Sequence, residues 1–460
     1  MLQSNEYQVK PYLRWYWQTK DFSTVTKRGK LDRTRRARLL LRALQAGLIL
    51  SYAIGLVLII AGVTRLSAAQ AVLGVVLFVA APVLWAHLIV IPLLLARWLI
   101  ARPKEHKLVD QAKGRFSATK AVKIAVAGSY GKTTMKELLL TVLSEGKKVA
   151  ATPANKNVAV SHAAFASKLK GDEEVIVIEY GEGKPGDVAG FARTTQPNIG
   201  IITGLAPAHL DQYKTLKAAG KDIFSLADYL GNKNVYVNNE SEAARSFIKP
   251  GHIEYDQNGL GGWHISGVTM TVQGMSFTMK KGKRSLQLTT GLIGQHLVGS
   301  LAVCVAIADS LGLTDEQIVN GVAKTLPFEH RMQPYPLAGG WVIDDTYNGT
   351  IEGMRAGLSL LKELEASKKT YVTPGLVDQG EETQNVHEEL GRLIAASDPE
   401  RVVLMKNSVT ESIEHGLSEG KYTGTLSIQD DPLAFYTNLD HFITGGEVVL
   451  MQNDWPDNYN

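Results

Sequence analysis

The fold of this chain is decided by the stretch from Val122 to Ser144, which reads VKIAVAGSYGKTTMKELLLTVLS. It begins with a short apolar run, Val122 to Ala127, of the kind typical of a buried parallel strand. A glycine-rich turn follows, and after it a predicted helix that extends to about Ser144. A strand, a glycine-rich turn and a helix in this order are the context of a phosphate-binding loop. The stretch therefore predicts an α/β domain that binds a nucleotide.

The turn in this stretch supplies the groups that a nucleotide needs. Its glycines let backbone N–H groups approach phosphate oxygens, and the following helix adds partial positive charge at its N-terminus. Lys132 is expected to reach the β- and γ-phosphates of ATP, and the Thr133 hydroxyl to bind Mg²⁺. Val126 stands where the full Walker spacing has glycine, so the loop is shortened, and a glycine-rich turn without catalytic meaning is the alternative. The candidate ATP-binding residues are Gly128, Ser129, Tyr130, Gly131, Lys132, Thr133 and Thr134.

Further apolar runs continue the α/β pattern toward the C-terminus. Four of them predict core parallel strands, namely 175–178, 199–203, 235–237 and 402–405. Alternating polar and apolar residues between Met270 and Met279 predict an antiparallel hairpin at a sheet edge.

Two long apolar stretches precede the phosphate-binding loop. Residues 43–63 contain no charged side chain, and residues 66–96 contain none apart from the titratable His87. Each stretch exceeds the roughly 20 residues that a helix needs to cross a bilayer core. We therefore expect two membrane spans, at about 43–63 and 68–96, joined in a tight helical hairpin. A buried helical pair in a soluble protein is the alternative.

Charge is distributed unevenly along the chain. Residues 1–123 carry 20 Lys and Arg against 5 Asp and Glu, whereas the rest of the chain carries 29 against 40. The positive-inside rule therefore places both ends of the hairpin, and the catalytic domains, on the cytoplasmic side of the inner membrane, in contact with membrane lipid. An acidic body argues against nucleic-acid binding, which needs a basic face. Cys304 is the single cysteine, which excludes an intramolecular disulfide.

Five motifs follow one another in the last three-quarters of the chain: AGSYGKTTMKE (127–137), TPANKNVAVS (152–161), VIVIEYGEGKPGDV (175–188), IGIITGLAPAHLDQY (199–213) and HRMQPYPLAGGWVIDDTYNGTIEGMRAGL (330–358). In this order they resemble the Mur ligase family. Within that family they look most like the branch that adds D-alanyl-D-alanine to UDP-N-acetylmuramoyl-tripeptide. The resemblance implies an α/β P-loop central domain followed by a Rossmann-like C-terminal domain.

The resemblance also implies a chemistry for residues of the central domain. ATP phosphorylates a carboxylate, and an amine then attacks the acyl phosphate, so positioned cations should supply much of the rate. Glu179, at the end of a strand, is implied to hold Mg²⁺ together with Thr133, and His209 to hold a second Mg²⁺. From the residues alone, His209 fits equally well in a turn that caps the next helix.

Three further site residues follow from the resemblance. The family uses a lysine carbamylated by CO₂ as a metal ligand, for which Lys221 is the candidate; Lys214, Lys217 and an ordinary solvated lysine remain open. Arg331 resembles the arginine that approaches the nucleotide phosphates, and Asp345 the carboxylate that bonds the ribose hydroxyls. A surface ion pair is the alternative for these last two residues.

The chain departs from the family pattern in three places. The N-terminal domain that holds the UDP end of the substrate is absent, and the apolar hairpin takes its place. A family His-Asn-x-x-Asn segment reads His296-Leu297-Val298-Gly299-Ser300, so an adenine-binding asparagine is lost. In the segment 373–380, Gly375 replaces an aspartate, which bears on recognition of the amine.

These observations lead us to expect three units: a basic tail with a transmembrane hairpin (1–119), a P-loop central domain (120–325) and a C-terminal domain (326–460). The expected function is ATP-dependent, ADP-forming amide ligation, most simply of D-alanyl-D-alanine or a similar amine to a muramoyl-peptide cell-wall precursor. The alternatives are a membrane-bound poly-γ-glutamate synthetase-like ligase and a non-catalytic P-loop scaffold of a cell-wall assembly.

Overall fold

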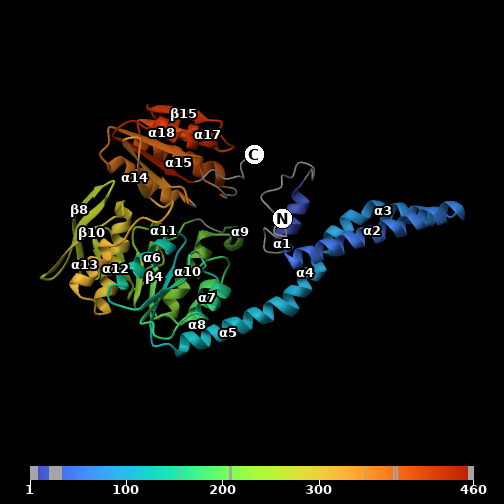
Figure 1. Cartoon of the computed structure of the whole chain (residues 1–460), viewed down its shortest axis with the longest axis horizontal. Coiled ribbons are helices and arrows are strands. Elements are labelled where there is room, and N and C mark those ends of the chain that lie inside the picture. Colours follow the sequence, from blue (N-terminus) through green and yellow to red (C-terminus); the bar gives the residue numbers. More distant parts are fainter. Residues whose placement is uncertain are drawn as a thin grey trace. The chain divides into compact units, whose positions relative to one another are not determined.

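The computed structural model describes residues 9–19, 34–154, 156–206, 210–347, 349–376, 379 and 382–453. The chain forms two compact units, Met1–Leu108 and Val109–Asn460. The first unit is helical and holds the apolar runs, while the second holds two β-sheets and the candidate site residues (Figure 1).

The first unit is built around a helical hairpin. Its long arms, α2 and α3, are joined by a short turn at Leu66, and Thr34 caps the first arm by accepting a hydrogen bond from the Ala37 backbone N–H at 3.2 Å. The second arm ends at Leu88, the residue whose carbonyl would accept a helical hydrogen bond from residue 92; Pro92 has no N–H to donate. The elements are α1 (Val9–Gln18), α2 (Arg35–Thr64), α3 (Ala68–Leu88), α4 (Val90–Ala96) and the π-helical turn η1 (Arg97–Ala101).

Small residues let the two arms approach closely. A Cβ built on Gly74 would lie 2.6 Å from the carbonyl oxygen of Gly55, so the backbones of α2 and α3 touch at this point. Near the other end of the hairpin, Trp85 Nε1 donates to Ser51 Oγ at 2.9 Å, which satisfies an indole N–H that would otherwise lie among apolar groups. Tyr12 on α1 donates to the Ala86 carbonyl oxygen at 2.9 Å and ties the first helix to the hairpin.

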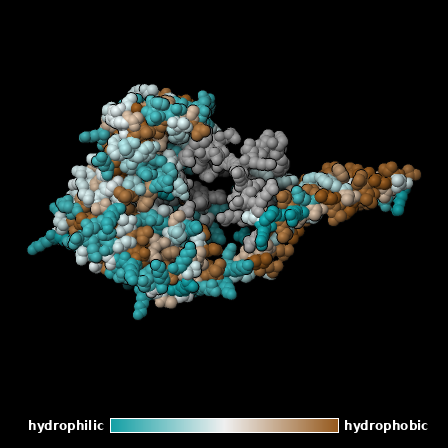
Figure 2. All heavy atoms as spheres, viewed as in Figure 1, coloured by the Kyte–Doolittle hydropathy of each residue, from teal (hydrophilic) through white to brown (hydrophobic). Residues whose placement is uncertain are grey.

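The outward faces of the hairpin are apolar. Helical segments Ala37–Thr64 and Ala68–Ala118 are long and apolar enough to cross a membrane by length and composition, and little of their most apolar windows is buried (17% and 11%). Hydrophobic colour covers most of the arms in Figure 2. In a soluble protein, the apolar surface of a core helix is buried by the rest of the protein. Most of the apolar surface of these two helical segments is not buried in this structure.

Helix α5 (Arg102–Ala118) leads into the second unit, whose first sheet has the order β10-β9-β8-β7-β6-β5-β4-β1-β3-β2. The six neighbouring strands β2, β3, β1, β4, β5 and β6 pair in parallel, and β7, β8, β9 and β10 continue the sheet with antiparallel pairings. The strands are β1 (Val122–Ala127), β2 (Val149–Ala151), β3 (Val175–Glu179), β4 (Ile199–Ile202), β5 (Val235–Asn238), β6 (Ile253–Asp256), β7 (Gly259–Leu260), β8 (Trp263–Thr271), β9 (Gly274–Lys281) and β10 (Arg284–Thr290).

Helices cover both faces of this first sheet. Alternate residues of β1 enter different cores: Ile124 and Val126 pack in a cluster with α6 and α12, whereas Ala125 and Ala127 pack with α7, α8 and α10. The helices are α6 (Lys132–Leu143), α7 (Ala159–Ala166), α8 (Asp187–Thr195), α9 (Leu210–Tyr213), α10 (Leu216–Tyr229), α11 (Glu242–Arg245), the 3₁₀ turn η2 (Gln295–Leu297), α12 (Val298–Ser310) and α13 (Asp315–Ala323).

The second sheet has the order β11-β12-β16-β13-β14-β15, and only its β11–β12 pairing is antiparallel. Its strands are β11 (Gln333–Leu337), β12 (Gly340–Asp345), β13 (Lys368–Thr373), β14 (Arg401–Met405), β15 (Thr425–Gln429) and β16 (Glu447–Gln452). The accompanying helices are α14 (Ile351–Glu363), α15 (Thr383–Ser397), α16 (Thr410–Glu419), α17 (Pro432–Thr437) and α18 (Leu439–Phe442).

The α/β prediction is confirmed, and the predicted parallel strands coincide with β3, β4, β5 and β14. The alternating segment 270–279 contains the end of β8, the turn and most of β9, which pair as the predicted antiparallel hairpin, but β10 and not this hairpin forms the outer edge of the sheet. The expected unit boundary near residue 325 falls between α13, the last helix associated with the first sheet, and β11, the first strand of the second.

Candidate functional site

The loop between β1 and α6 has the backbone geometry of a phosphate cradle. Gly128 has φ = +145°, and a Cβ there would lie 2.3 Å from Thr203 Oγ1, so only glycine fits. Gly131 has φ = +73° and precedes the first residue of α6. The Ser129 N–H donates to the Gly204 carbonyl oxygen at 2.9 Å, and the Thr203 hydroxyl donates to the Tyr130 carbonyl. Residues at the end of β4 thus hold the loop open above the N-terminus of α6.

Thr133 and Glu179 meet beside this loop, as expected for a shared metal ion. Thr133 Oγ1 donates to Glu179 Oε1 at 3.1 Å, and Asn157 Nδ2 donates to the same oxygen at 3.1 Å. Glu179 is 1% exposed, and its other carboxylate oxygen accepts no hydrogen bond from any described residue. A buried carboxylate oxygen with open acceptor capacity next to a hydroxyl suits a hard cation such as Mg²⁺.

Lys136 balances the charge of Glu179. Its side chain is fully buried, and its ammonium lies 3.5 Å from Glu179 Oε2 and 3.0 Å from Glu137 Oε1. It also donates to the Ala154 carbonyl oxygen at 2.6 Å. The sequence marked Lys136 and Glu137 only as part of a motif, but the structure makes Lys136 the cation that stabilises a buried acid at the candidate metal site.

Lys132 has a partner that the sequence reasoning missed. Its ammonium lies 2.8 Å from Glu182 Oε2 and donates as well to the Gly128 carbonyl oxygen. The side chain of Glu182 is 3% exposed. In the sequence, only its position could have pointed to Glu182, which follows Glu179 by three residues in the loop after β3.

The second metal site is not assembled among the residues that the structure describes. His209 lies outside those residues. Lys221 is exposed on α10, with no hydrogen bond or ion pair seen to a described residue. In the next position, Asp222 is buried and accepts from the Gly186 N–H at 2.7 Å and from the Tyr213 hydroxyl at 2.8 Å. It is therefore Asp222 that turns inward from this part of α10, and it caps the N-terminus of α8.

In the second sheet, Asp345 lies at the end of β12 and is held by neighbouring donors. The Met332 N–H donates to it at 3.2 Å and Gln452 Nε2 at 2.7 Å. Burial raises the pKa of Asp345 to about 6, although these hydrogen bonds and the positive charge of Arg331 act in the opposite direction. The Arg331 guanidinium lies 4.7 Å from the centre of the Tyr347 ring. The structure thus brings Arg331 and Asp345 into one region, and their roles at the phosphates and the ribose stay predictions.

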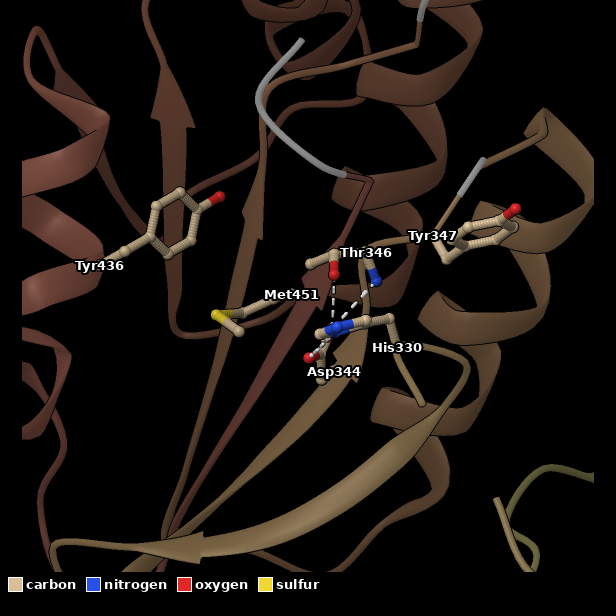
Figure 3. Close-up of a pocket in the computed structure, with 6 residues that line it drawn as sticks. All are labelled: His330, Asp344, Thr346, Tyr347, Tyr436 and Met451. Carbon is tan, nitrogen blue, oxygen red and sulfur yellow. Dashed lines mark hydrogen bonds and ion pairs between the residues drawn. The ribbon is translucent and has the colours of Figure 1, made fainter. Parts of the chain in front are cut away.

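The preceding aspartate, Asp344, lines a separate hollow of about 240 Å³. It accepts hydrogen bonds from Thr346 Oγ1 at 2.7 Å and the Thr346 N–H at 3.1 Å, and its other oxygen lies 2.7 Å from His330 Nδ1. Successive strand residues face opposite sides of a sheet, so Asp344 and Asp345 serve different surroundings. Figure 3 shows His330, Asp344 and Thr346 drawn together, with Met451 next to them and Tyr436 farther away.

The departures from the family pattern have structural counterparts. Gly375 has φ = +89°, and a Cβ there would lie 2.9 Å from the His387 ring, so the local backbone requires glycine. The neighbouring Leu376 N–H donates to His387 Nε2 at 2.9 Å. Leu297 ends the short 3₁₀ turn before α12 and offers no polar group. Asp378, in the same departing segment as Gly375, lies outside the described residues.

Comparison with known proteins agrees with this architecture. Residues 126–308 match the family model of the Mur ligase middle domain. A UDP-N-acetylmuramoyl-tripeptide–D-alanyl-D-alanine ligase of Mycobacterium leprae is 25% identical over 368 residues, which cover 72% of this chain and 70% of that protein. A crystal structure of MurF from Acinetobacter baumannii has a TM-score of 0.65 at 21% identity, covering 76% of this chain and 77% of that one. MurF from Thermotoga maritima in complex with ADP also has a TM-score of 0.65, at 20% identity, with coverages of 76% and 80%.

Proposed function

Because the chain carries the middle domain of the Mur ligase family, whose members are ATP-dependent, ADP-forming ligases, we propose that it joins an amine to a muramoyl-peptide carboxylate. The amine is D-alanyl-D-alanine or a close analogue, which is what the name of the Mycobacterium leprae relative states for that protein. The observation that carries the proposal is the position of Thr133 and Glu179 beside the glycine loop that begins at Gly128.

The chain's own groups suit the two steps of such a reaction. A substrate carboxylate oxygen attacks the γ-phosphorus of ATP, and the bond to the ADP oxygen breaks. The amine then attacks the acyl carbon, a C–N bond forms, and inorganic phosphate leaves while the amine loses its proton. Both steps build negative charge on phosphate oxygens, which the loop N–H groups, the N-terminus of α6 and Lys132 would stabilise.

Mg²⁺ fits the residues beside the loop. Thr133 and Glu179 would hold it, because one oxygen of Glu179 is buried and accepts no hydrogen bond from a residue that the structure describes. The ion would supply charge neutralisation at the β- and γ-phosphates. From the second sheet, Arg331 would approach the phosphates and Asp345 the ribose hydroxyls, in keeping with the ADP present in the Thermotoga maritima structure. His209 and Lys221 remain proposed ligands of a second Mg²⁺.

The first unit supports a membrane location. We place the α2–α3 hairpin across the cytoplasmic membrane, since its faces are apolar and its flanks basic. The catalytic unit would then lie on the cytoplasmic side, where a nucleotide-linked or a lipid-linked muramoyl peptide can reach it.

The test is product formation by the purified full-length protein with ATP and Mg²⁺, read by mass spectrometry. UDP-muramoyl-tripeptide with D-alanyl-D-alanine is supplied in one reaction, a lipid-linked muramoyl peptide with the same dipeptide in a second, and glutamate alone in a third. A gain of one dipeptide in either of the first two reactions is expected. A growing γ-linked polymer in the third would replace the proposed substrates, and no product in any reaction would favour the scaffold.

A further inference from the structure

The phosphate-loop lysine is already bound to an acid. Lys132 Nζ lies 2.8 Å from Glu182 Oε2, with side-chain exposures of 13% and 3%. A charge pair this far from solvent is screened little, so it holds both side chains in place more firmly than a surface ion pair does. The ammonium has three protons, of which Glu182 and the Gly128 carbonyl oxygen take two.

The ion pairs that the described residues form beside the loop are net negative before a nucleotide arrives. Lys132 pairs with Glu182, and Lys136 pairs with Glu137 and Glu179, so two ammonium groups face three carboxylates. A phosphate oxygen and a Glu182 oxygen bound to the same ammonium would lie about 4–5 Å apart, a distance at which like charges repel. The nucleotide phosphates therefore have to displace Glu182 from Lys132, or their negative charge has to be compensated by added positive charge.

We propose that Glu182 is a positioning residue that holds Lys132 against the loop and competes with the nucleotide phosphates for it. If Thr133 and Glu179 hold Mg²⁺, its positive charge would let the phosphates take Lys132 from Glu182. Glu182 thereby makes nucleotide binding depend on the metal ion and penalises binding of the metal-free nucleotide. This inference rests on the proposed function, because it requires that Lys132 binds nucleotide phosphates.

The test compares the affinity for ADP in the presence of Mg²⁺ and in EDTA, by calorimetry on the detergent-solubilised full-length protein. Glu182→Gln removes the charge and keeps the shape of the side chain. It is expected to lower the Kd for metal-free ADP about tenfold or more, while the Kd for Mg-ADP changes less than about threefold. Glu174→Gln is the matched control, since Glu174 pairs with Lys147 at 3.5 Å and is half exposed. It should leave both constants unchanged.

A second variant, Glu182→Asp, keeps the inference testable if Glu182→Gln does not fold. Glu182→Asp keeps the negative charge beside the buried lysine but withdraws it by about 1.5 Å, the length of one carbon–carbon bond. It should strengthen metal-free binding in the same direction, by about threefold, and thermal unfolding checks that both variants are folded.

Each outcome bears on the inference. An unchanged Mg²⁺ dependence in folded Glu182→Gln overturns it, while nucleotide binding in that experiment leaves the proposed function standing. Weaker Mg-ADP binding in Glu182→Gln also overturns it, because Glu182 would then act as a metal ligand. If the wild-type protein binds no ADP in either condition, the inference and the proposed function both fall.

Discussion

Thr133 Oγ1 donates a 3.1 Å hydrogen bond to Glu179 Oε1 and so joins the first turn of α6 to the last residue of β3. The two residues are 46 positions apart in the chain. They meet because β1 and β3 pair in parallel, which brings the carboxyl ends of both strands to the same edge of the sheet. In open α/β sheets, ligands bind outside the carboxyl ends of the strands. Here the end of β3 carries a buried acid, and the helix that follows β1 carries a hydroxyl.

Replacing Glu179 by Gln should abolish ligation without unfolding the protein. The amide oxygen can still accept from Thr133 and Asn157, but the charge that would hold Mg²⁺ is lost, so we expect product formation to fall by about 10²-fold or more. Glu145→Gln, which alters a surface pair with Lys324, should retain activity. Loss of product with retained assembly into a cell-wall complex supports the enzyme, whereas an active Glu179→Gln would remove the metal role of this residue.

Adding one methyl group at Gly128 should block the loop. Its Cβ would collide with Thr203 Oγ1, and φ = +145° is strained for any other residue, so Gly128→Ala should weaken nucleotide binding beyond detection and destabilise the fold by about 1–3 kcal/mol. Gly190→Ala is the matched control within α8, because a Cβ there meets no atom within 4 Å. It should bind nucleotide normally and unfold at the same or a slightly higher temperature, since alanine favours helix. Normal ADP binding by Gly128→Ala would contradict the cradle geometry.

Asp345 should make stability depend on pH. Its pKa is raised by burial from 3.8 to about 6, so its contribution is fully present below about pH 4 and is lost as the pH rises through 6. The loss amounts to roughly 3 kcal/mol. Asp345→Asn has no such group, so its unfolding temperature relative to wild type should rise between pH 4 and pH 7. Changes in hydrogen bonding caused by the substitution shift the unfolding temperature of the variant by an amount that does not depend on pH. The readout is therefore the slope of the difference in unfolding temperature against pH. Parallel pH profiles of the two proteins would show that Asp345 titrates normally.

Charges placed in the middle of α3 should release the protein from membranes. Leu73 and Val76 are exposed apolar residues of this helix, and each arginine at a span centre costs about 2.5–3.5 kcal/mol. Leu73→Arg combined with Val76→Arg should reduce the fraction that resists carbonate extraction. Leu66→Arg is the control, because Leu66 lies in the turn between the arms and is 94% exposed. Extraction of the wild-type protein by carbonate would contradict a membrane-spanning hairpin.

Local patterns in the sequence predicted much of the fold. The run 122–134 predicted β1, the loop and the start of α6, because an apolar strand followed by a glycine-rich turn and a helix is the local pattern of a phosphate-binding loop. The apolar stretches at 43–63 and 68–96 predicted two helices by length and composition, which need no tertiary information. The first lies within α2, and the second is divided in the structure into α3 and α4.

Pairings across the chain were beyond local patterns. Lys132 with Glu182 and Asp222 with the N-terminus of α8 both join residues that are tens of positions apart, so no spacing rule could single them out. Asp344 and Asp345 are adjacent and chemically identical, and only the register of β12 decides which faces the hollow and which faces Gln452. Lys221 and Asp222 differ in the same way through the rotation of α10 against the sheet.

The sequence by itself therefore determined several core strands, the phosphate loop with the helix after it and the apolar hairpin, and which residue types stand at the phosphate loop. Only the tertiary structure decided which acid meets which lysine. Chain-local periodicity follows from backbone geometry within a few residues, whereas ion-pair partners are selected by strand order and by burial, which exclude water and leave each charge only the neighbours that packing brings to it.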